Sequence, residues 1–295
     1  MFFGPQYDEP LFRPPSEAYS LIFQLTLGCS WNKCAFCEMY TSKKFKVKPE
    51  EQVMKEIDEM ASTGQQVRKI FLADGNAMVL STGKLLKILD KLKQSFPKLM
   101  RVSAYARPMD MENKTHEDLA KLKEAGLKLV YVGIESGDDE LLERINKGES
   151  SESTVRNLKK LKEAEIKQSV MIINGLGGKL YSEQHAKQSA EVVNKIQPEF
   201  LSTLVLSFPY GVEHFQKRFD GKFEEMNTME LLEEQYNFIC QTELHNVVFR
   251  SDHASNYLSL KGILGRDKEN MKSQLESALN NPSGTPLREE WQRGL

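Results

Sequence analysis

The chain is organised around the stretch Gly28–Tyr40, which reads Gly-Cys-Ser-Trp-Asn-Lys-Cys-Ala-Phe-Cys-Glu-Met-Tyr and holds three of its four cysteines. Cys29, Cys34 and Cys37 are spaced C-x4-C-x2-C, and Cys240 lies far along the chain. A structural zinc ion normally takes four protein ligands in recognisable pairs, which this loop does not offer. Three thiolates instead suit a 4Fe-4S cluster with one iron left open for a substrate or cofactor.

This loop resembles that of the radical S-adenosylmethionine (radical SAM) superfamily, whose signature is three cysteines after the first strand of a barrel. Phe36 stands where the superfamily has an aromatic residue before the third cysteine. The usual spacing is C-x3-C-x2-C, so one extra residue lies between Cys29 and Cys34, an insertion that costs little. The other interpretations are a structural zinc half-site and three buried cysteines that act as small hydrophobes.

Outward from the loop, strand and helix patterns alternate. The apolar run Leu21–Leu27 is of strand length and ends at Gly28. Further strands are predicted at 70–73, 102–106, 127–134, 169–173 and 200–206, with helical patterns between them. Six such units predict an α/β fold with a parallel sheet, curled into an open partial TIM barrel, (βα)6.

Three domains are predicted from this pattern. Residues 1–20 are proline-rich and form an extended lead-in, and residues 21–206 form the partial barrel. Residues 207–295 form a C-terminal α/β substrate cap, with helices near 229–241 and 268–279 and a strand-like segment at 246–250. Active sites on parallel sheets lie at the carboxyl ends of the strands, where the polar residues discussed next are found.

The resemblance implies which residues bind S-adenosylmethionine. Asp74-Gly75-Asn76 matches the position of the superfamily's Gly-Gly-Glu segment, which receives the methionine amino group, so Asp74 or Asn76 is the expected acceptor. Gly133-Ile134-Glu135-Ser136-Gly137 matches the ribose-binding segment, with Glu135 accepting from the ribose hydroxyls. Arg144 resembles the arginine that points at the cofactor carboxylate.

Asn174 and Gly175, after the fifth strand, are expected to let the backbone approach the adenine. Each of these segments also has a plainer interpretation. Asp74 could cap an ordinary turn, Glu135 could cap the following helix, as Ser136 or Asp138 could equally well, and Arg144 could be an exposed helix charge.

The predicted substrate residues come from two segments. Arg250, His253 and Asn256 lie in the polar stretch of the cap, and Tyr105 and Arg107 end the third strand. Together they would recognise an anionic or heterocyclic ligand. The alternative is a solvated loop in which His253 is a local hydrogen-bond partner. The other histidines, His116, His185, His214 and His245, show no metal spacing and are expected at the surface, and Cys240 is expected to pack in a helix.

Composition limits the partners. The 295 residues carry 40 basic and 42 acidic side chains with no basic block, so a nucleic-acid partner is disfavoured. Neither an apolar run of spanning length nor a secretory leader is present, so no membrane association is expected. Cysteines that ligate iron require a reducing compartment, and the cytoplasm is expected.

The resemblance implies an enzyme that reductively cleaves S-adenosylmethionine at the cluster, forming a 5'-deoxyadenosyl radical that abstracts hydrogen from a small-molecule substrate. An electron donor such as flavodoxin or ferredoxin would be needed. The substrate candidates include a modified nucleoside or base, in a lyase-type reaction such as queuosine or queuine salvage. The alternatives are a tetrapyrrole-directed enzyme like the coproporphyrinogen oxidases, which with the methylthiotransferases form the nearest branch, or a non-catalytic iron-sulfur or zinc-binding protein. The sequence identifies no catalytic residue.

Overall fold

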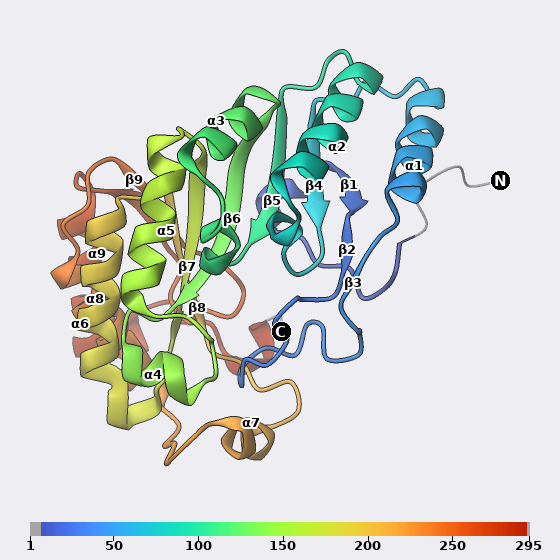
Figure 1. The fold of residues 1–295 in the computed structure, drawn as a ribbon. Helices are drawn as coiled ribbons and strands as arrows, with labels where there is room; N and C mark the ends of the chain where they lie inside the picture. The colour runs from blue at the N-terminus through green and yellow to red at the C-terminus, as the bar shows by residue number, and fades with distance from the viewer. Residues whose placement is uncertain (1–6, 294–295) are drawn as a thin grey trace. The chain divides into compact units, whose positions relative to one another are not determined.

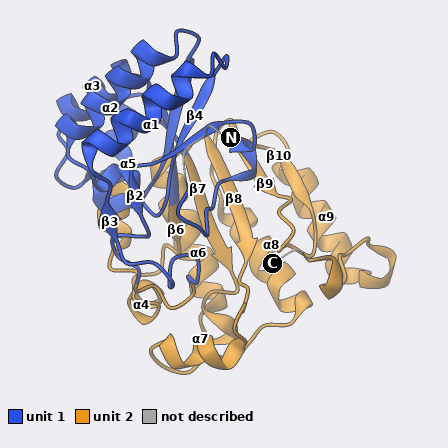
Figure 2. Cartoon of the chain, turned by 90° about the vertical axis from the view of Figure 1, so that its right-hand side faces the viewer, with its two compact units in different colours: residues 1–32, 37–132, 157–168 blue, residues 33–36, 133–156, 169–295 orange. Residues whose placement is uncertain are grey.

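The computed structural model describes residues 7–293, so residues 1–6 of the predicted lead-in lie outside the described residues. The chain divides into two compact units (Figure 2). The first holds the chain up to residue 32 with 37–132 and 157–168, and the second holds 33–36, 133–156 and the chain from 169 onward. The cysteine loop therefore contributes to both units. The predicted domain boundary at residue 206 is not a border of either unit.

The first unit is built on parallel strands (Figure 1) in the order β1 (Leu21–Gln24), β4 (Lys69–Ala73), β5 (Arg101–Ala106) and β6 (Leu127–Glu135). Three helices lie side by side along it: α1 (Glu50–Ser62), α2 (Thr82–Ser95) and α3 (His116–Glu124). The predicted first strand is interrupted at Leu25. Its end, β2 (Thr26–Leu27), pairs antiparallel with β3 (Lys46–Val47), so this short ribbon closes the base of the cysteine loop.

The second unit takes residues 133–135 of β6 and continues with β7 (Lys167–Asn174), β8 (Phe200–Val205), β9 (Val247–Ser251) and β10 (Leu260–Leu264). Strand β8 is parallel to both β7 and β9, and β10 is antiparallel to β9. The helices that follow β6 are α4 (Asp139–Arg144), α5 (Ser151–Glu163), α6 (Gly178–Ile196), α7 (Val212–Arg218), α8 (Thr228–Gln241) and α9 (Lys268–Asn280). Helix α8 packs between α6 and α9.

This mainly parallel sheet of eight strands confirms the predicted α/β class and the strand order of a partial barrel. The six predicted strands correspond to β1 and β4 to β8, and the segment predicted as a cap extends the sheet by β9 and β10. Strand β10 contains Gly262, which weakened its strand pattern. A Cβ atom at Gly262 would lie 2.5 Å from Met271 Cε, so the close packing of α9 requires glycine there.

Described residues of the lead-in pack on the sheet of the first unit. Tyr7 and Leu11 contact the buried cluster of Ile22, Phe71 and Ala73. Glu17, which is fully buried, accepts hydrogen bonds from four side chains. Ser20 Oγ donates to its Oε2, and its Oε1 accepts from Arg101 Nη2 (2.6 Å), Tyr131 Oη (2.6 Å) and Ser103 Oγ (2.9 Å). A carboxylate is tolerated without water when its lone pairs are satisfied in this way.

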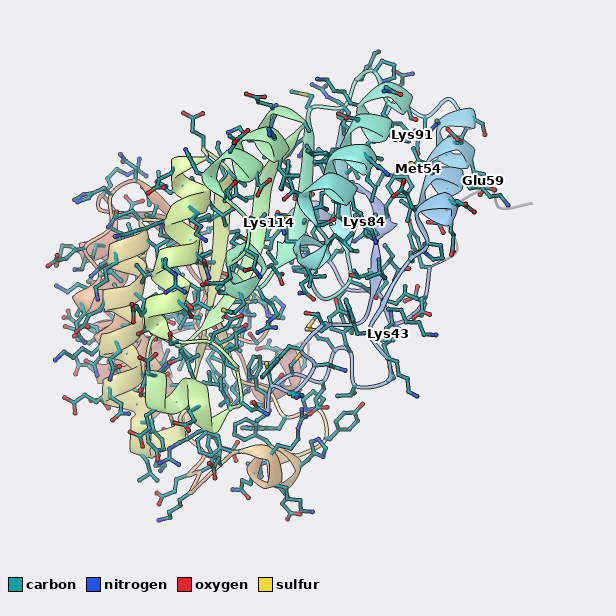
Figure 3. All side chains as sticks on the ribbon, viewed as in Figure 1. Lys43, Met54, Glu59, Lys84, Lys91 and Lys114 are labelled. Carbon is teal, nitrogen blue, oxygen red and sulfur yellow. The ribbon has the colours of Figure 1, made fainter. Side chains whose placement is uncertain are left out.

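We expect Glu17→Ala to lower the free energy of unfolding by about 2–4 kcal/mol, because it leaves buried donors without their acceptor. Urea unfolding measures this loss. The matched control is Glu59→Ala on α1, labelled in Figure 3, whose ion pair with Lys55 is exposed and contributes under about 0.5 kcal/mol. Equal losses in the two variants would contradict the structural role of Glu17.

Candidate functional site

The cysteine loop is held at its start by a buried carboxylate. Asp74, at the end of β4, has no exposed surface and adopts a φ of 62°. Its Oδ2 accepts from Gly28 N (2.9 Å) and Lys43 Nζ (3.0 Å), and its Oδ1 accepts from Gln24 Nε2 (3.1 Å). Gly28 itself has a φ of 72°, a backbone conformation that glycine adopts readily. Asp74 therefore fixes the backbone immediately before Cys29.

Asn76 holds the other side of Cys29. Its Oδ1 accepts from Ser30 N (3.0 Å), and its Nδ2 donates to Ser30 Oγ (2.8 Å) and Asp110 Oδ1 (2.8 Å). Between the two side chains, a Cβ atom on Gly75 would lie 2.3 Å from Cys29 Cα, so only glycine allows this approach. The predicted acceptors of the methionine amino group thus bind the loop backbone, and their contact with a cofactor stays a prediction.

Lys43 connects the loop to the lead-in. Its ammonium group contacts Asp74 and lies 2.6 Å from Asp8 O and 3.1 Å from Asp8 Oδ1, with the side chain 4% exposed. Gln24 also bonds both Asp8 and Asp74. Figure 3 labels Lys43. The sequence suggested no role for this lysine, which stood in an ordinary basic segment, because its partners are remote in the chain.

In the second unit, the middle of the loop is fixed through its backbone. Ala35 N donates to Ile145 O (2.8 Å), and Arg218 Nη2 donates to Cys34 O (2.7 Å). The Lys147 ammonium lies 5.9 Å from the centre of the Phe36 ring. Phe36 thus lies beside a buried cation, in the position that the resemblance gives to an aromatic residue.

Glu135 combines strain, burial and an unsatisfied oxygen. Its φ is 69°, its side chain is 7% exposed, and Oε1 accepts from Lys147 Nζ (3.1 Å). A Cβ atom on Gly133 would lie 1.8 Å from Oε1, so the carboxylate folds back over a glycine. Within residues 7–293, Oε2 has no hydrogen-bond partner. A buried acceptor of this kind is suited to a ligand hydroxyl.

Lys147 is a residue that the sequence analysis missed. Burial alone would lower the pKa of its ammonium group, but the charges of Glu135, Cys34 and Glu149 outweigh burial and raise the pKa, so the side chain is a cation. Arg144, the predicted cation, lies on α4, where it bonds Glu140 (2.8 Å) and Asp220 O (2.6 Å). Lys147 is thus paired with Glu135 and Arg144 with Glu140, and the contact of Arg144 with the cofactor carboxylate stays a prediction.

The segment after Glu135 is tied to α6. Ser136 Oγ and His185 Nδ1 lie 2.8 Å apart, and His185 Nε2 lies 3.0 Å from Ile173 O. The predicted surface position of His185 was wrong, since it is 1% exposed and fills the inner face of α6, whereas His116, His214 and His245 are exposed as predicted. Ser136 also accepts from Asp138 N (3.0 Å), so it supports the start of α4.

Asn174 and Gly175, at the end of β7, contact α8. Asn174 Nδ2 donates to Gln235 Oε1 (2.6 Å), and Gly175 N donates to Glu234 Oε1 (2.6 Å). Burial raises the pKa of Glu234, partly offset by His185. Gly175, with a φ of 77°, brings the backbone close to Leu231. The adenine contact predicted for this turn stays a prediction.

The predicted substrate residues are divided between the units. Tyr105 packs edge-on against Phe71 (4.9 Å between ring centres), and burial raises the pKa of its hydroxyl. Arg107 lies over the Trp31 ring at 5.1 Å. Both belong to the first unit, and Arg250, His253 and Asn256 belong to the second.

Within the second unit the three cap residues are separated. Asn256 is buried, donates to Thr203 O (2.9 Å) and lines a small cavity with Asn174 and Gln235. His253 is exposed, and its Nδ1 accepts from Ser255 N (3.1 Å), as the local-turn interpretation expected. Arg250 is exposed on β9. Arg250 and His253 are thus exposed and Asn256 is buried, and the contact of these residues with a substrate stays a prediction.

All four cysteines carry thiols rather than disulfides, and Cys240 lies in α8 as predicted. In the described part of the chain, no three Cys, His, Asp or Glu side chains form a ready-made metal site. The donor set of the loop nevertheless fits an iron-sulfur cluster, because three partly exposed thiols stand on a backbone that buried contacts hold in place. No helix among the described residues is long and apolar enough to span a membrane.

Comparison with known proteins gives a consistent result. The model of the radical SAM superfamily matches residues 23–191. A heme chaperone (HemW) of Bacillus subtilis is 25% identical over 152 residues, which are 51% of this chain and 40% of the relative. The tRNA-2-methylthio-N(6)-dimethylallyladenosine synthase of Treponema denticola is 26% identical over 206 residues, 65% of this chain and 44% of the relative. This chain thus matches less than half the length of either relative.

The fold is similar to that of coproporphyrinogen III oxidase from Escherichia coli. The TM-score is 0.59 at 14% sequence identity, and the match covers 91% of this chain and 70% of the oxidase. At this identity the likeness concerns the fold alone.

We expect Lys43→Met to lower the free energy of unfolding by about 3 kcal/mol, because it leaves the buried Asp74 carboxylate without its counter-charge. Urea unfolding gives this value, and Lys44→Met, at an exposed neighbouring position, should change stability by less than about 0.5 kcal/mol. In the double variant Lys43→Met, Asp74→Asn the loss should be smaller than the sum of the single losses. Additive losses would show that the pair is not coupled.

Proposed function

Because the chain belongs to the radical SAM superfamily, we propose that it is an enzyme that cleaves S-adenosylmethionine reductively and abstracts hydrogen from a small-molecule substrate. Members of this superfamily are enzymes that use a 4Fe-4S cluster and S-adenosylmethionine. The observation that carries the proposal is the loop with Cys29, Cys34 and Cys37, whose backbone is held by buried contacts from Asp74, Asn76 and Arg218. The subfamily is not assigned.

The protein's contribution is to hold the two cofactors. Cys29, Cys34 and Cys37 would ligate the cluster, which would supply the reducing electron for cleavage of S-adenosylmethionine. Glu135 Oε2 would accept a hydrogen bond from a ribose hydroxyl. Lys147, beside Glu135, would hold the cofactor carboxylate in place of Arg144, whose guanidinium group is engaged by Glu140 and Asp220.

The substrate class proposed first is a modified nucleoside or base, in a lyase-type reaction such as queuosine or queuine salvage. A second candidate is tetrapyrrole chemistry or heme carriage, which the match to a heme chaperone favours. Titration with hemin, followed by the absorption of the bound heme, distinguishes the second candidate. The thiolate ligands call for a reducing compartment, for which we propose the cytoplasm, with a flavodoxin or ferredoxin as donor.

The proposal is tested by anaerobic reconstitution with iron, sulfide and dithionite. The protein should then convert S-adenosylmethionine to 5'-deoxyadenosine and methionine, which chromatography detects. A fully loaded cluster without any 5'-deoxyadenosine would favour the non-catalytic iron-sulfur interpretation.

Replacing any loop cysteine should remove the cluster. We expect Cys29→Ala, Cys34→Ala and Cys37→Ala each to hold little iron after reconstitution, because a site-differentiated cluster needs all three thiolates. Cys240→Ala, on α8, is the control and should keep the iron content of the unaltered protein. A full cluster in any loop variant would refute the ligand assignment.

Glu135→Gln should weaken S-adenosylmethionine binding about 5- to 150-fold, equivalent to about 1–3 kcal/mol, while iron content stays unchanged. The glutamine keeps the size of the side chain, but it replaces the charged carboxylate that accepts a hydrogen bond from the ribose hydroxyl with a neutral amide. Lys147→Met should weaken binding as well, whereas Arg144→Met should have little effect. Calorimetry on the reconstituted, unreduced protein measures the affinity of all three variants for S-adenosylmethionine. A larger loss of affinity in Arg144→Met than in Lys147→Met would show that Arg144, and not Lys147, binds the cofactor carboxylate.

A further inference from the structure

The strands β7 to β10 of the second unit present one face to the helices and one away from them. A Cβ atom on Gly262 would meet Met271 of α9, so position 262 faces the helix. Because side chains alternate along a strand, Lys261 in β10 lies on the opposite face. Lys261 is the register partner of Arg250 in β9, and Arg250 is the partner of Ser202 in β8. Arg250, Lys261 and Ser202 therefore form one row on the face away from α9.

Burial along the strands agrees with this assignment. In β9, Val247, Phe249 and Ser251 are buried, whereas Arg250 is exposed. The intervening positions of β8, such as Ser202, are also more open than Leu201 and Thr203. The row is thus accessible to a ligand.

Arg250 and Lys261 have no ion pair or hydrogen bond to any residue within 7–293. Like charges directly opposite each other on neighbouring strands repel and destabilise the sheet. Other cations near the sheets are paired with buried acids, for example Arg101 with Glu17 and Lys147 with Glu135. Two adjacent cations without a counter-ion therefore indicate a place for an external anion.

We propose that Arg250 and Lys261 bind an anionic group of the substrate, a carboxylate or a phosphate, on the sheet face of the second unit. This inference rests on the proposed function and narrows its substrate to an anion. The guanidinium group offers two parallel donors to a carboxylate or phosphate, and the ammonium group adds a second positive charge. Lys261 is absent from the residues that the sequence analysis selected, because its pairing with Arg250 depends on strand register.

Two anions serve as probes, inorganic phosphate and succinate, each titrated by calorimetry at low ionic strength into the 295-residue protein. We expect one of them to bind at one site per chain, and its affinity to fall at least tenfold in Arg250→Met and in Lys261→Met. The controls Lys187→Met and Lys195→Met remove equal charge from exposed positions of α6 and should bind like the unaltered protein. Preference for phosphate or succinate identifies which anionic group the site accepts.

Stability provides a second readout. Removing either cation relieves the repulsion, so each variant should unfold at the same or a higher temperature than the unaltered protein. The inference is overturned if neither probe binds, if the α6 variants lose as much affinity as the row variants, or if either row variant fails to fold.

The titration needs neither cluster nor reductant, so it is independent of the proposed function. Anion binding that depends on Arg250 and Lys261, in a protein that forms no 5'-deoxyadenosine, would reject radical chemistry and leave an anion-binding protein. Formation of 5'-deoxyadenosine without such binding would reject only this inference.

Discussion

The first unit depends on one buried charge, the carboxylate of Asp74. A carboxylate without exposed surface is strongly unfavourable unless donors replace its water, and here Gly28 N, Lys43 Nζ and Gln24 Nε2 do so. Each donor comes from a different part of the chain: the start of the cysteine loop, its end and the first strand. The cost of burying Asp74 is therefore recovered only when all three parts are in place. These contacts hold the start of the cysteine loop within the first unit.

The hydrogen bonds of the buried acids distinguish residues that hold the fold from residues that can hold a ligand. Asp74 and Glu17 are surrounded by donors, and both join segments remote in sequence. Glu135 is also buried, but only one of its carboxylate oxygens has a hydrogen-bond partner among the described residues, and its backbone has a positive φ. A residue that is strained and incompletely bonded is costly to the folded chain. Such a cost is understandable where a ligand completes the bonding.

Much of the fold could be predicted from local pattern, because apolar runs of strand length and helical periodicity are properties of short stretches. The six strands from β1 to β8 that carry the parallel sheet were found in this way, as was the cysteine loop. Strand β10 was missed because it contains Gly262, whose lack of a side chain makes room for Met271 on a helix. His185 was misplaced because its partners Ser136 and Ile173 lie on other elements. Lys43 and Lys147 were overlooked for the same reason. A lysine in sequence looks identical whether it is solvated or paired with a buried acid.

The residues predicted to meet the substrate show that sequence proximity does not imply a shared role. Arg250, His253 and Asn256 lie within seven positions, yet Asn256 supports β8 through Thr203 and His253 closes a turn. Arg250 differs because the alternation of β9 directs it away from the buried face, beside a lysine from a strand that the sequence did not reveal. Strand register across β8, β9 and β10 places Ser202, Arg250 and Lys261 in one row. A row of this kind would select a substrate by charge, while the cysteine loop supplies reactivity that is the same for every substrate of the superfamily.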